Sequence, residues 1–297
     1  MWYRQASGHC VTNLADARRR YAESLRAAAN LRSHALVEAF ARVPREHFLG
    51  PGPWQIMVPP PNLGPYVTTP DADPVHLYQD VLVAIDAARM LNNGHPASLA
   101  AWFDALELAA GDRVLHVGCG VGYYTAVLAE TVGADGQVTG IELDAELAAR
   151  SRANLAYLPN TLVQQGDGNA LDTGPRDAIF INAGANVSQP LWLDRLTVGG
   201  RLLLPLTASF DETETNTHGL GLMLKIMRSA AGYGARFISP VGIFPCIGAR
   251  SLEADRHLRA AFARGDSDAV RSLRRDRHEP TDTCWLHWSA GCLSTLA

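Results

Sequence analysis

The chain has 297 residues, of which 47% are hydrophobic and 19% charged, as in an ordinary soluble globular protein. Its formal net charge at pH 7 is −4, and Lys225 is its only lysine. This balance argues against an obligate nucleic-acid binder, which usually carries a basic surplus. Nothing in the sequence resembles a signal peptide or a membrane span, so we expect a cytoplasmic protein with no membrane partner.

The cysteines are odd in number and scattered along the chain. They are Cys10, Cys119, Cys246, Cys284 and Cys292. No pair of them has the spacing of zinc ligands, so no metal is expected, and a reducing compartment is the simpler interpretation. Most of a dispersed set of histidines are expected to be surface or packing residues. They are His9, His34, His76, His218, His257, His278 and His287.

Apolar residues at helical spacing predict one or two helices over residues 13–41. Residues 50–74 are rich in proline and glycine and show no period. A loop of this length in a compact domain is usually functional or disordered. Its apolar residues Trp54, Ile56, Met57 and Val58 form either a lid over a pocket or a surface excursion pinned by prolines.

Residues 78–85 predict a short strand, and residues 90–98 a turn that leads into a helix. Pro96 suits the first position of that helix. Its buried side would be formed by Leu99, Trp102, Phe103 and Leu106.

Strands and helices then alternate, which predicts a parallel, doubly wound sheet. The strands are expected near residues 113–117, 137–141, 160–164, 177–182 and 199–205. Late strands at 219–227 and 235–241 would form a hairpin on the sheet edge. Such sheets bind ligands at the carboxyl ends of their strands. Gly118–Gly122, Glu142, Gly166–Gly168 and Asn182–Asn186 all lie there.

The first of these strands ends in alternating glycines, Gly118, Gly120 and Gly122. A dinucleotide fingerprint would place its third glycine where Tyr123 stands. Alternating glycines suit a ligand without phosphates, such as the amino-acid part of S-adenosylmethionine. Glu142 ends the next apolar run, where a carboxylate can accept both ribose hydroxyls. We therefore favour a nucleotide-type site over a merely structural turn.

Residues 249–297 form a tail with two predicted helices and a terminal strand at 284–288. It carries the arginines Arg271, Arg274, Arg275 and Arg277. These either hold an acidic substrate or form a solvated helix face.

Taken together, these motifs resemble the protein-L-isoaspartate O-methyltransferase family of class I S-adenosylmethionine-dependent methyltransferases. The resemblance runs from about Leu25 to Val241. Val43–Phe48 is similar to the family's "VPREhF", and Gln165–Gly168 to its "GDG". The other matching segments are Arg113–Ala129, Asp177–Asn186 and Leu196–Leu206.

The resemblance implies a set of residues that bind S-adenosyl-L-methionine and release S-adenosyl-L-homocysteine. Glycines of the turn would line the methionine part, Glu142 would hold the ribose, and Asp167 with Gly168 would contact the adenine. His116 stands where the family has an acid, so it either reaches the cofactor or is a strand-end residue. The whole set is His116, Gly118, Cys119, Gly120, Gly122, Glu142, Leu143, Asp167, Gly168 and Asn182. Cys119 is expected to be a packing residue and not a nucleophile.

The acceptor loop departs from the family. A serine hydroxyl that helps to position the substrate carboxyl is missing here, unless Ser98 substitutes for it from the next helical turn. His95, Ser98 and Asn93 are the candidate catalytic residues, with Asn92 beside them, as hydrogen-bond donors to the acceptor carboxylate. The alternative is a turn with helix-capping polar residues.

The expected fold is thus a doubly wound, mostly parallel seven-stranded Rossmann-like α/β sheet with N-terminal helices and a C-terminal α/β extension. We expect N-terminal helices and a substrate segment (1–98), a cofactor-binding core (99–248) and the extension (249–297). The leading hypothesis is a carboxyl O-methyltransferase acting on a peptide, a protein or a small acid, and not on nucleic acid. The alternatives are a true L-isoaspartyl repair enzyme and a non-catalytic adaptor.

Overall fold

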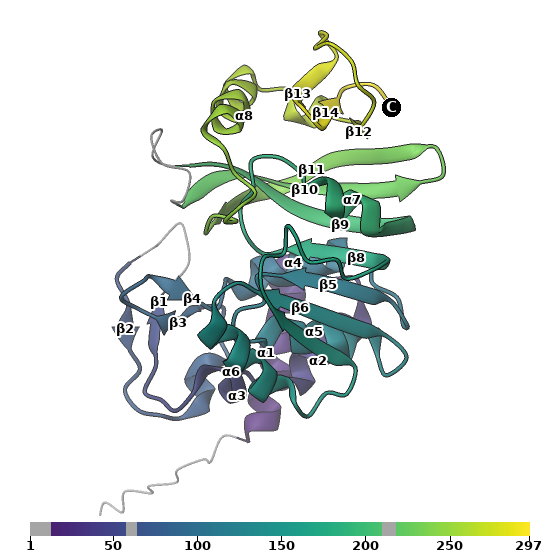
Figure 1. The fold of residues 1–297 in the computed structure, drawn as a ribbon. Helices are drawn as coiled ribbons and strands as arrows, with labels where there is room; N and C mark the ends of the chain where they lie inside the picture. The colour runs from purple at the N-terminus through teal and green to yellow at the C-terminus, as the bar shows by residue number, and fades with distance from the viewer. Residues whose placement is uncertain (1–12, 58–63, 210–217) are drawn as a thin grey trace, which may run out of the picture. The chain divides into compact units, whose positions relative to one another are not determined.

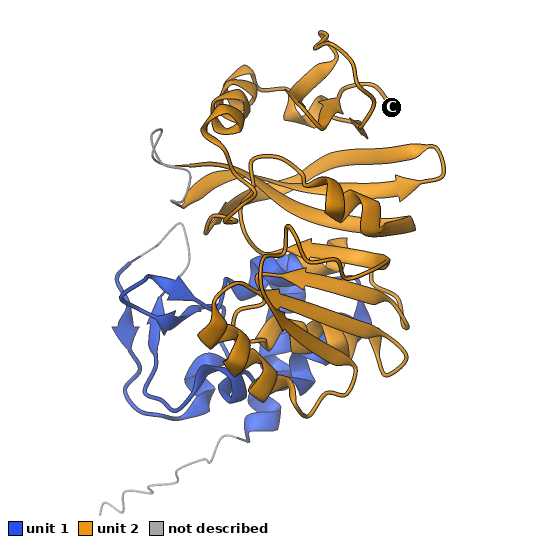
Figure 2. Ribbon diagram, viewed as in Figure 1, with its two compact units in different colours: residues 1–101 blue, residues 102–297 orange. Residues whose placement is uncertain are grey.

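The computed structural model describes residues 13–57, 64–209 and 218–297. The chain splits into two compact units, residues 1–101 and 102–297, whose boundary falls within helix α4 (Pro96–Ala105). Figure 2 shows the two units in different colours. Over the described ranges, no helix is both long and apolar enough to cross a membrane.

The first unit combines helices with a small sheet. Helices α1 (Leu14–Ala29) and α2 (His34–Arg42) confirm the prediction for residues 13–41, and Asn13 and Ser33 cap their first turns with side-chain oxygens. Helix α3 (Arg45–Leu49) follows. The sheet has the order β2-β1-β3-β4, from strands Val67–Thr68, Gln55–Met57, Leu82–Asp86 and Leu91–Asn92.

The proline-rich stretch 50–74 is therefore more regular than expected, since it supplies β1 and β2. Trp54 and Met57 are buried, and Trp54 packs in a cluster with Leu77 and Val83. The lid interpretation of Val58 lies outside the described residues. The lid and the surface excursion both stay predictions.

The strand predicted at 78–85 begins only at Leu82, after the 3-10 turn Pro74–Leu77. The chain between them curves around the fully buried Arg45. The Arg45 guanidinium donates to the carbonyls of Leu77, Gln79 and Val81 at 2.7, 3.1 and 2.9 Å. These carbonyls bond to a side chain and not to a neighbouring strand, which explains the late start of β3.

The second unit is built on a ten-stranded mixed sheet (Figure 1), in the order β13-β14-β12-β11-β10-β9-β8-β5-β6-β7. Its parallel part comprises β5 (Arg113–Val117), β6 (Gln137–Glu142), β7 (Thr161–Gln165), β8 (Arg176–Ile181) and β9 (Leu196–Ser209). Strands β10 (Gly219–Ser229) and β11 (Gly232–Ile243) continue it antiparallel. These seven strands confirm the expected class I core.

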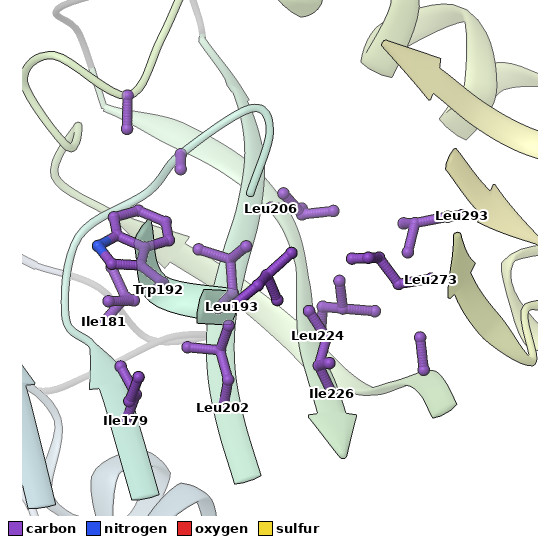
Figure 3. Packing of buried hydrophobic residues seen from close by; sticks show 14 of the residues in the cluster. Ile179, Ile181, Trp192, Leu193, Leu202, Leu206, Leu224, Ile226, Leu273 and Leu293 are labelled. Carbon is purple, nitrogen blue, oxygen red and sulfur yellow. The ribbon is translucent and has the colours of Figure 1, made fainter. Parts of the chain in front are cut away.

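Helices cover both faces of this core, as side-chain alternation along the strands requires. On one face His116 and Phe180 meet aromatic and hydroxyl groups of α4 and of α5 (Tyr123–Val132). On the other, Ile179, Ile181 and Leu202 join a cluster with Trp192 of helix α7 (Pro190–Arg195), seen in Figure 3. Helix α6 (Ala145–Leu155) packs along β6 and β7.

The C-terminal extension departs from the sequence-based prediction. Helix α8 (Leu252–Arg264) forms as expected, with Ser251 as its cap. The second helix is wrong, because a 3-10 turn (Ser267–Ala269) and strand β12 (Ser272–Arg274) take its place. Strand β13 (Cys284–Trp288) matches the predicted terminal strand and pairs with β14 (Gly291–Ser294). Since β12 pairs with β11, the β10–β11 hairpin is not at the sheet edge.

Candidate functional site

The glycine turn Gly118–Gly122 joins β5 to α5 at the carboxyl edge of the parallel strands. The amides of Gly118 and Cys119 both donate to the Ile141 carbonyl, at 2.8 and 3.1 Å. All three glycines have positive φ, +77°, +55° and +95° in chain order. The turn is therefore fastened to the end of β6 and adopts a backbone conformation that favours glycine.

The three glycines differ in what surrounds them. A Cβ at Gly122 would lie 2.7 Å from Ser151 Oγ on α6, and one at Gly118 would lie 3.2 Å from the Asn182 carbonyl oxygen. A Cβ at Gly120 would meet nothing within 4 Å. Gly122 thus serves helix packing, whereas Gly120 leaves its backbone open to a ligand.

Glu142, at the end of β6, binds this turn directly. One carboxylate oxygen accepts from the Gly120 amide at 2.8 Å, and the other accepts from the Asp144 amide at 3.0 Å. A carboxylate offers about four lone pairs, so two remain for further donors such as ribose hydroxyls. Glu142 is only 9% exposed, and the carboxylate holds turn and strand end together.

The ends of β7 and β8 complete the edge. Asp167 accepts from the amide and the side chain of Asn169 at 2.9 and 2.6 Å, which fixes its orientation. A Cβ at Gly168 would clash with Val117 at 2.4 Å, so this position requires glycine for packing. Asn182 Nδ2 donates to the Gly118 carbonyl at 3.2 Å. Sequence reasoning did not identify Asn169.

Leu143 follows Glu142 and is 44% exposed. The carboxylate, the open glycine and this exposed leucine fit a ligand with hydroxyl, polar and aromatic parts. The predicted cofactor residues at the ends of β5, β6, β7 and β8 thus share one edge of one sheet.

The side chains of His116 and Cys119 are buried. His116 is fully buried, its Nδ1 lies 2.9 Å from Thr125 Oγ1, and its Nε2 is buried without a hydrogen bond. Burial lowers the pKa of His116 to about 3 and raises the pKa of the Cys119 thiol to about 12. The environment of His116 favours the strand-residue interpretation, and the raised thiol pKa argues against Cys119 as a nucleophile.

The candidate acceptor residues lie in the first unit, where His95 and Ser98 form a chain of hydrogen bonds with Asp80. His95 Nε2 is 3.0 Å from an Asp80 oxygen and His95 Nδ1 is 2.8 Å from Ser98 Oγ. The second Asp80 oxygen accepts from the Ala97 amide at 2.9 Å. Burial opposes ionisation of Asp80, but the bonds from His95 and Ala97 outweigh it and lower the Asp80 pKa.

Asp80 is a residue that sequence reasoning left out of the site, because it is 15 positions from His95. The β3–β4 hairpin brings the two together. Asn93 is 7% exposed, and its Nδ2 is buried without a hydrogen bond, so it is a donor available to a ligand. Asn92 instead closes its own turn by accepting from the Gly94 amide at 2.9 Å.

The arginines of the tail do not share a helix face. Arg274 pairs with Asp276, and Arg275 with Asp194 at 2.6 Å. Arg271 Nη1 donates to the Val270 carbonyl at 2.9 Å. The solvated-helix interpretation is wrong because Arg274 belongs to strand β12.

Comparison with known proteins points to one family. Residues 66–218 match the family model described as Protein-L-isoaspartate(D-aspartate) O-methyltransferase. The chain is 32% identical over 247 residues to protein-L-isoaspartate O-methyltransferase 1 of Geotalea uraniireducens, covering 81% of this chain and 97% of the relative. It is 36% identical over 174 residues to the Ignicoccus hospitalis protein-L-isoaspartate O-methyltransferase, covering 57% of this chain and 78% of that one.

Solved structures share the fold. One protein-L-isoaspartate O-methyltransferase superposes with a TM-score of 0.62 at 20% identity, over 88% of this chain and 72% of that one. A second, from Plasmodium falciparum in complex with S-adenosyl-L-homocysteine, gives a TM-score of 0.57 at 17% identity, over 77% and 97%.

Proposed function

Because this chain belongs to the protein-L-isoaspartate O-methyltransferase family, we propose that it methylates the carboxylate of an L-isoaspartyl residue in a protein or peptide. It is an S-adenosylmethionine-dependent O-methyltransferase, as its relatives are. The names of those relatives support a protein substrate. Neither a small-acid substrate nor an adaptor role finds support among them.

The cofactor part of the proposal rests on Glu142, which accepts from the Gly120 amide in the glycine turn and from the Asp144 amide just beyond β6. We infer that Glu142 uses its remaining lone pairs for the ribose hydroxyls, and that the backbone at Gly120 faces the methionine part. Asp167, oriented by Asn169, is assigned to the adenine. Leu143 supplies apolar surface beside the adenosine.

The reaction needs no general base, because a carboxylate is already ionised at neutral pH. When bound, S-adenosylmethionine supplies a methyl group on a positively charged sulfur. An acceptor oxygen forms a bond to the methyl carbon as the carbon–sulfur bond breaks, giving a methyl ester and S-adenosylhomocysteine. The protein must hold the acceptor in line and exclude water.

We assign the hold on the acceptor carboxylate to Ser98 and Asn93. Asp80 orients His95, and His95 Nδ1 lies 2.8 Å from Ser98 Oγ, so Asp80 and His95 are positioning residues. When the acceptor binds, the Ser98 hydroxyl proton turns from His95 Nδ1 to the acceptor carboxylate. Asn93 Nδ2 is a buried donor that a carboxylate would satisfy. In this proposal Ser98 supplies the hydroxyl that the acceptor loop otherwise lacks.

The test is methyl transfer from radiolabelled cofactor to a matched peptide pair that differs only in an L-isoaspartyl or an ordinary aspartyl linkage. We expect base-labile label on the isoaspartyl peptide alone. Small dicarboxylates and RNase-treated cell extract run in parallel. Label on dicarboxylates alone, RNase-sensitive label, or cofactor binding without label on any acceptor would each contradict the proposal.

A further inference from the structure

We propose that His278, Cys284, His287 and Cys292 form a zinc site in the C-terminal extension. One ligand atom from each residue lies within 4.8 Å of all the others. The four residues fall outside residues 66–218, the segment that matches the family model. The site does not depend on the proposed acceptor.

Three of the ligands belong to the hairpin of strands β13 and β14, which Figure 1 shows near the C-terminus. His287 lies directly opposite Cys292, so their side chains share a face. Cys284 is three positions from His287, which in a regular strand would place it on the other face. The register shifts between Cys284 and Leu286, and this bulge sets Cys284 opposite Ser294, on the same face as Cys292.

That bulge explains why the sequence did not predict a metal. The spacing of the four residues matches no common zinc pattern, and only an irregular strand makes Cys284 and His287 neighbours. His278 joins them from the loop between β12 and β13. The expectation of no metal was based on cysteine pairs alone, whereas this set mixes two cysteines with two histidines.

The distances suit a tetrahedral ion. Bond lengths to zinc of about 2.3 Å for sulfur and 2.0 Å for nitrogen imply a sulfur–nitrogen edge of about 3.5 Å. Cys284 Sγ and His278 Nε2 are 3.4 Å apart. The rings of His278 and His287 meet edge to face, with centroids 5.0 Å apart, and each offers a ring nitrogen within 4.8 Å of the other ligand atoms.

Neighbouring groups orient the ligands as in known zinc sites. His278 Nδ1 lies 2.9 Å from the Asp276 carbonyl oxygen. Donation of the Nδ1 proton to that oxygen leaves the Nε2 lone pair for a metal. The Thr281 amide donates to Cys284 Sγ at 3.5 Å, as donors commonly do to metal-bound thiolates. His287 Nδ1 is buried and makes no hydrogen bond.

Two thiolates and two imidazoles form a set typical of structural zinc, with no position left for substrate. Hard ions such as magnesium and calcium prefer oxygen ligands, which this set lacks. The ion would join the loop around His278 to the hairpin, where Cys292 is fully buried and the other three ligands are partly exposed. We therefore assign it a role in the folding of residues 275–297.

The experiment measures zinc in the purified full-length chain after reconstitution with zinc and removal of excess ion. We expect one equivalent per chain, reduced below a tenth by Cys284→Ser and by His287→Gln. His257→Gln, at an exposed histidine on α8, is the matched control and should keep the full equivalent. Cobalt added to the metal-free protein should give the absorption bands of a tetrahedral thiolate complex, absent in both ligand variants.

Chelation gives a second measurement that needs no variant. Removing zinc should speed proteolytic cleavage within residues 275–297, and adding it back should restore protection. Stoichiometric zinc binding would be disproved by a metal-free protein that still takes up no zinc or cobalt under reducing conditions. A Cys284–Cys292 disulfide that persists under reducing conditions with zinc present would also overturn the proposal. So would alkylation of Cys284 at the same rate with and without zinc.

Discussion

Two buried polar side chains near the edge of the sheet, Glu142 and His116, have different roles. Glu142 holds the glycine turn and, in the proposed function, the ribose. His116 contributes to packing against Phe180 while one ring nitrogen stays without a hydrogen bond. These two residues differ in what their loss should change, and each gives a separate measurement.

We expect Glu142→Ala to weaken S-adenosylmethionine binding by about 1–3 kcal/mol, the usual scale for hydrogen bonds to a charged acceptor. The variant also frees the Gly120 and Asp144 amides, so the turn itself should loosen. Titration calorimetry measures the affinity. Glu146→Ala, an exposed acid four residues away, is the control. Equal affinities for the two variants would remove Glu142 from the cofactor site.

His116 should make folding stability depend on pH. Its pKa is about 3 in the folded chain, against about 6.5 for an unfolded histidine. Below pH 6.5 the unfolded state therefore binds a proton that the native state does not. Stability should fall as the pH drops from 6.5 towards 3, by up to about 1.4 kcal/mol per pH unit. Above pH 6.5 the residue is neutral in both states and contributes no pH dependence.

Urea unfolding of wild type and His116→Gln at several pH values between 8 and 5 tests this. The free-energy difference between the two proteins should shrink as the pH falls, because only wild type has this buried histidine. His257→Gln should keep the wild-type pH dependence. Parallel curves for wild type and His116→Gln would show that His116 does not titrate on unfolding.

Secondary-structure elements were predictable where local signals were strong. The strands and helices from Arg113 to Ile243 follow from apolar runs, glycine turns and capping residues, and the structure confirms them. Glu142 and the glycines were found because they end such runs. The prediction of secondary structure failed where hydrogen bonds between distant residues determine the backbone, as in residues 77–81, whose carbonyls bond to Arg45. It failed in the extension because β12 is only three residues long and pairs with distant strands.

The candidate site shows the same division. His95 and Ser98 lie beside a motif, so the sequence alone could name them as candidates. Asp80 and the four candidate zinc ligands were not, since hairpin pairing and a bulge bring them together. The division into residues 1–98, 99–248 and 249–297 stays a prediction, as does a cytoplasmic location.

The start of α4 should control turnover without affecting cofactor binding. His95→Gln and Asp80→Asn each break the chain from Asp80 to Ser98. Misplacing a positioning group costs roughly tenfold to hundredfold in kcat/KM. Steady-state methylation of the isoaspartyl peptide measures it, with cofactor affinity from calorimetry unchanged. His76→Gln is the matched control, because His76 pairs with Asp71 at 2.8 Å on the surface of the same unit. An equal loss of kcat/KM in His76→Gln would contradict the assignment of Asp80 and His95 as positioning residues.

The extension is part of the core of residues 102–297 and not an appendage on their surface. Leu273, Trp285 and Leu293 belong to the cluster that also holds Leu224 and Ile226. Figure 3 shows Leu273 and Leu293 directed toward the leucines of the central strands. Strands β12, β14 and β13 continue the same sheet. A substitution in the buried part of the extension should therefore destabilise the sheet that carries the candidate cofactor site.

Leu293→Ala tests this coupling. Leu293 is fully buried opposite Leu273, so truncation leaves a cavity and should cost about 2–5 kcal/mol of unfolding free energy. Leu296→Ala, three residues away and 55% exposed, should change it by less than about 0.5 kcal/mol. Unfolding is followed by circular dichroism and, separately, by loss of S-adenosylmethionine binding. If the extension shares the core, both signals shift together. The extension would unfold independently if Leu293→Ala only sped proteolysis of the β13–β14 hairpin. In that case S-adenosylmethionine binding would be lost at the same unfolding midpoint as in wild type.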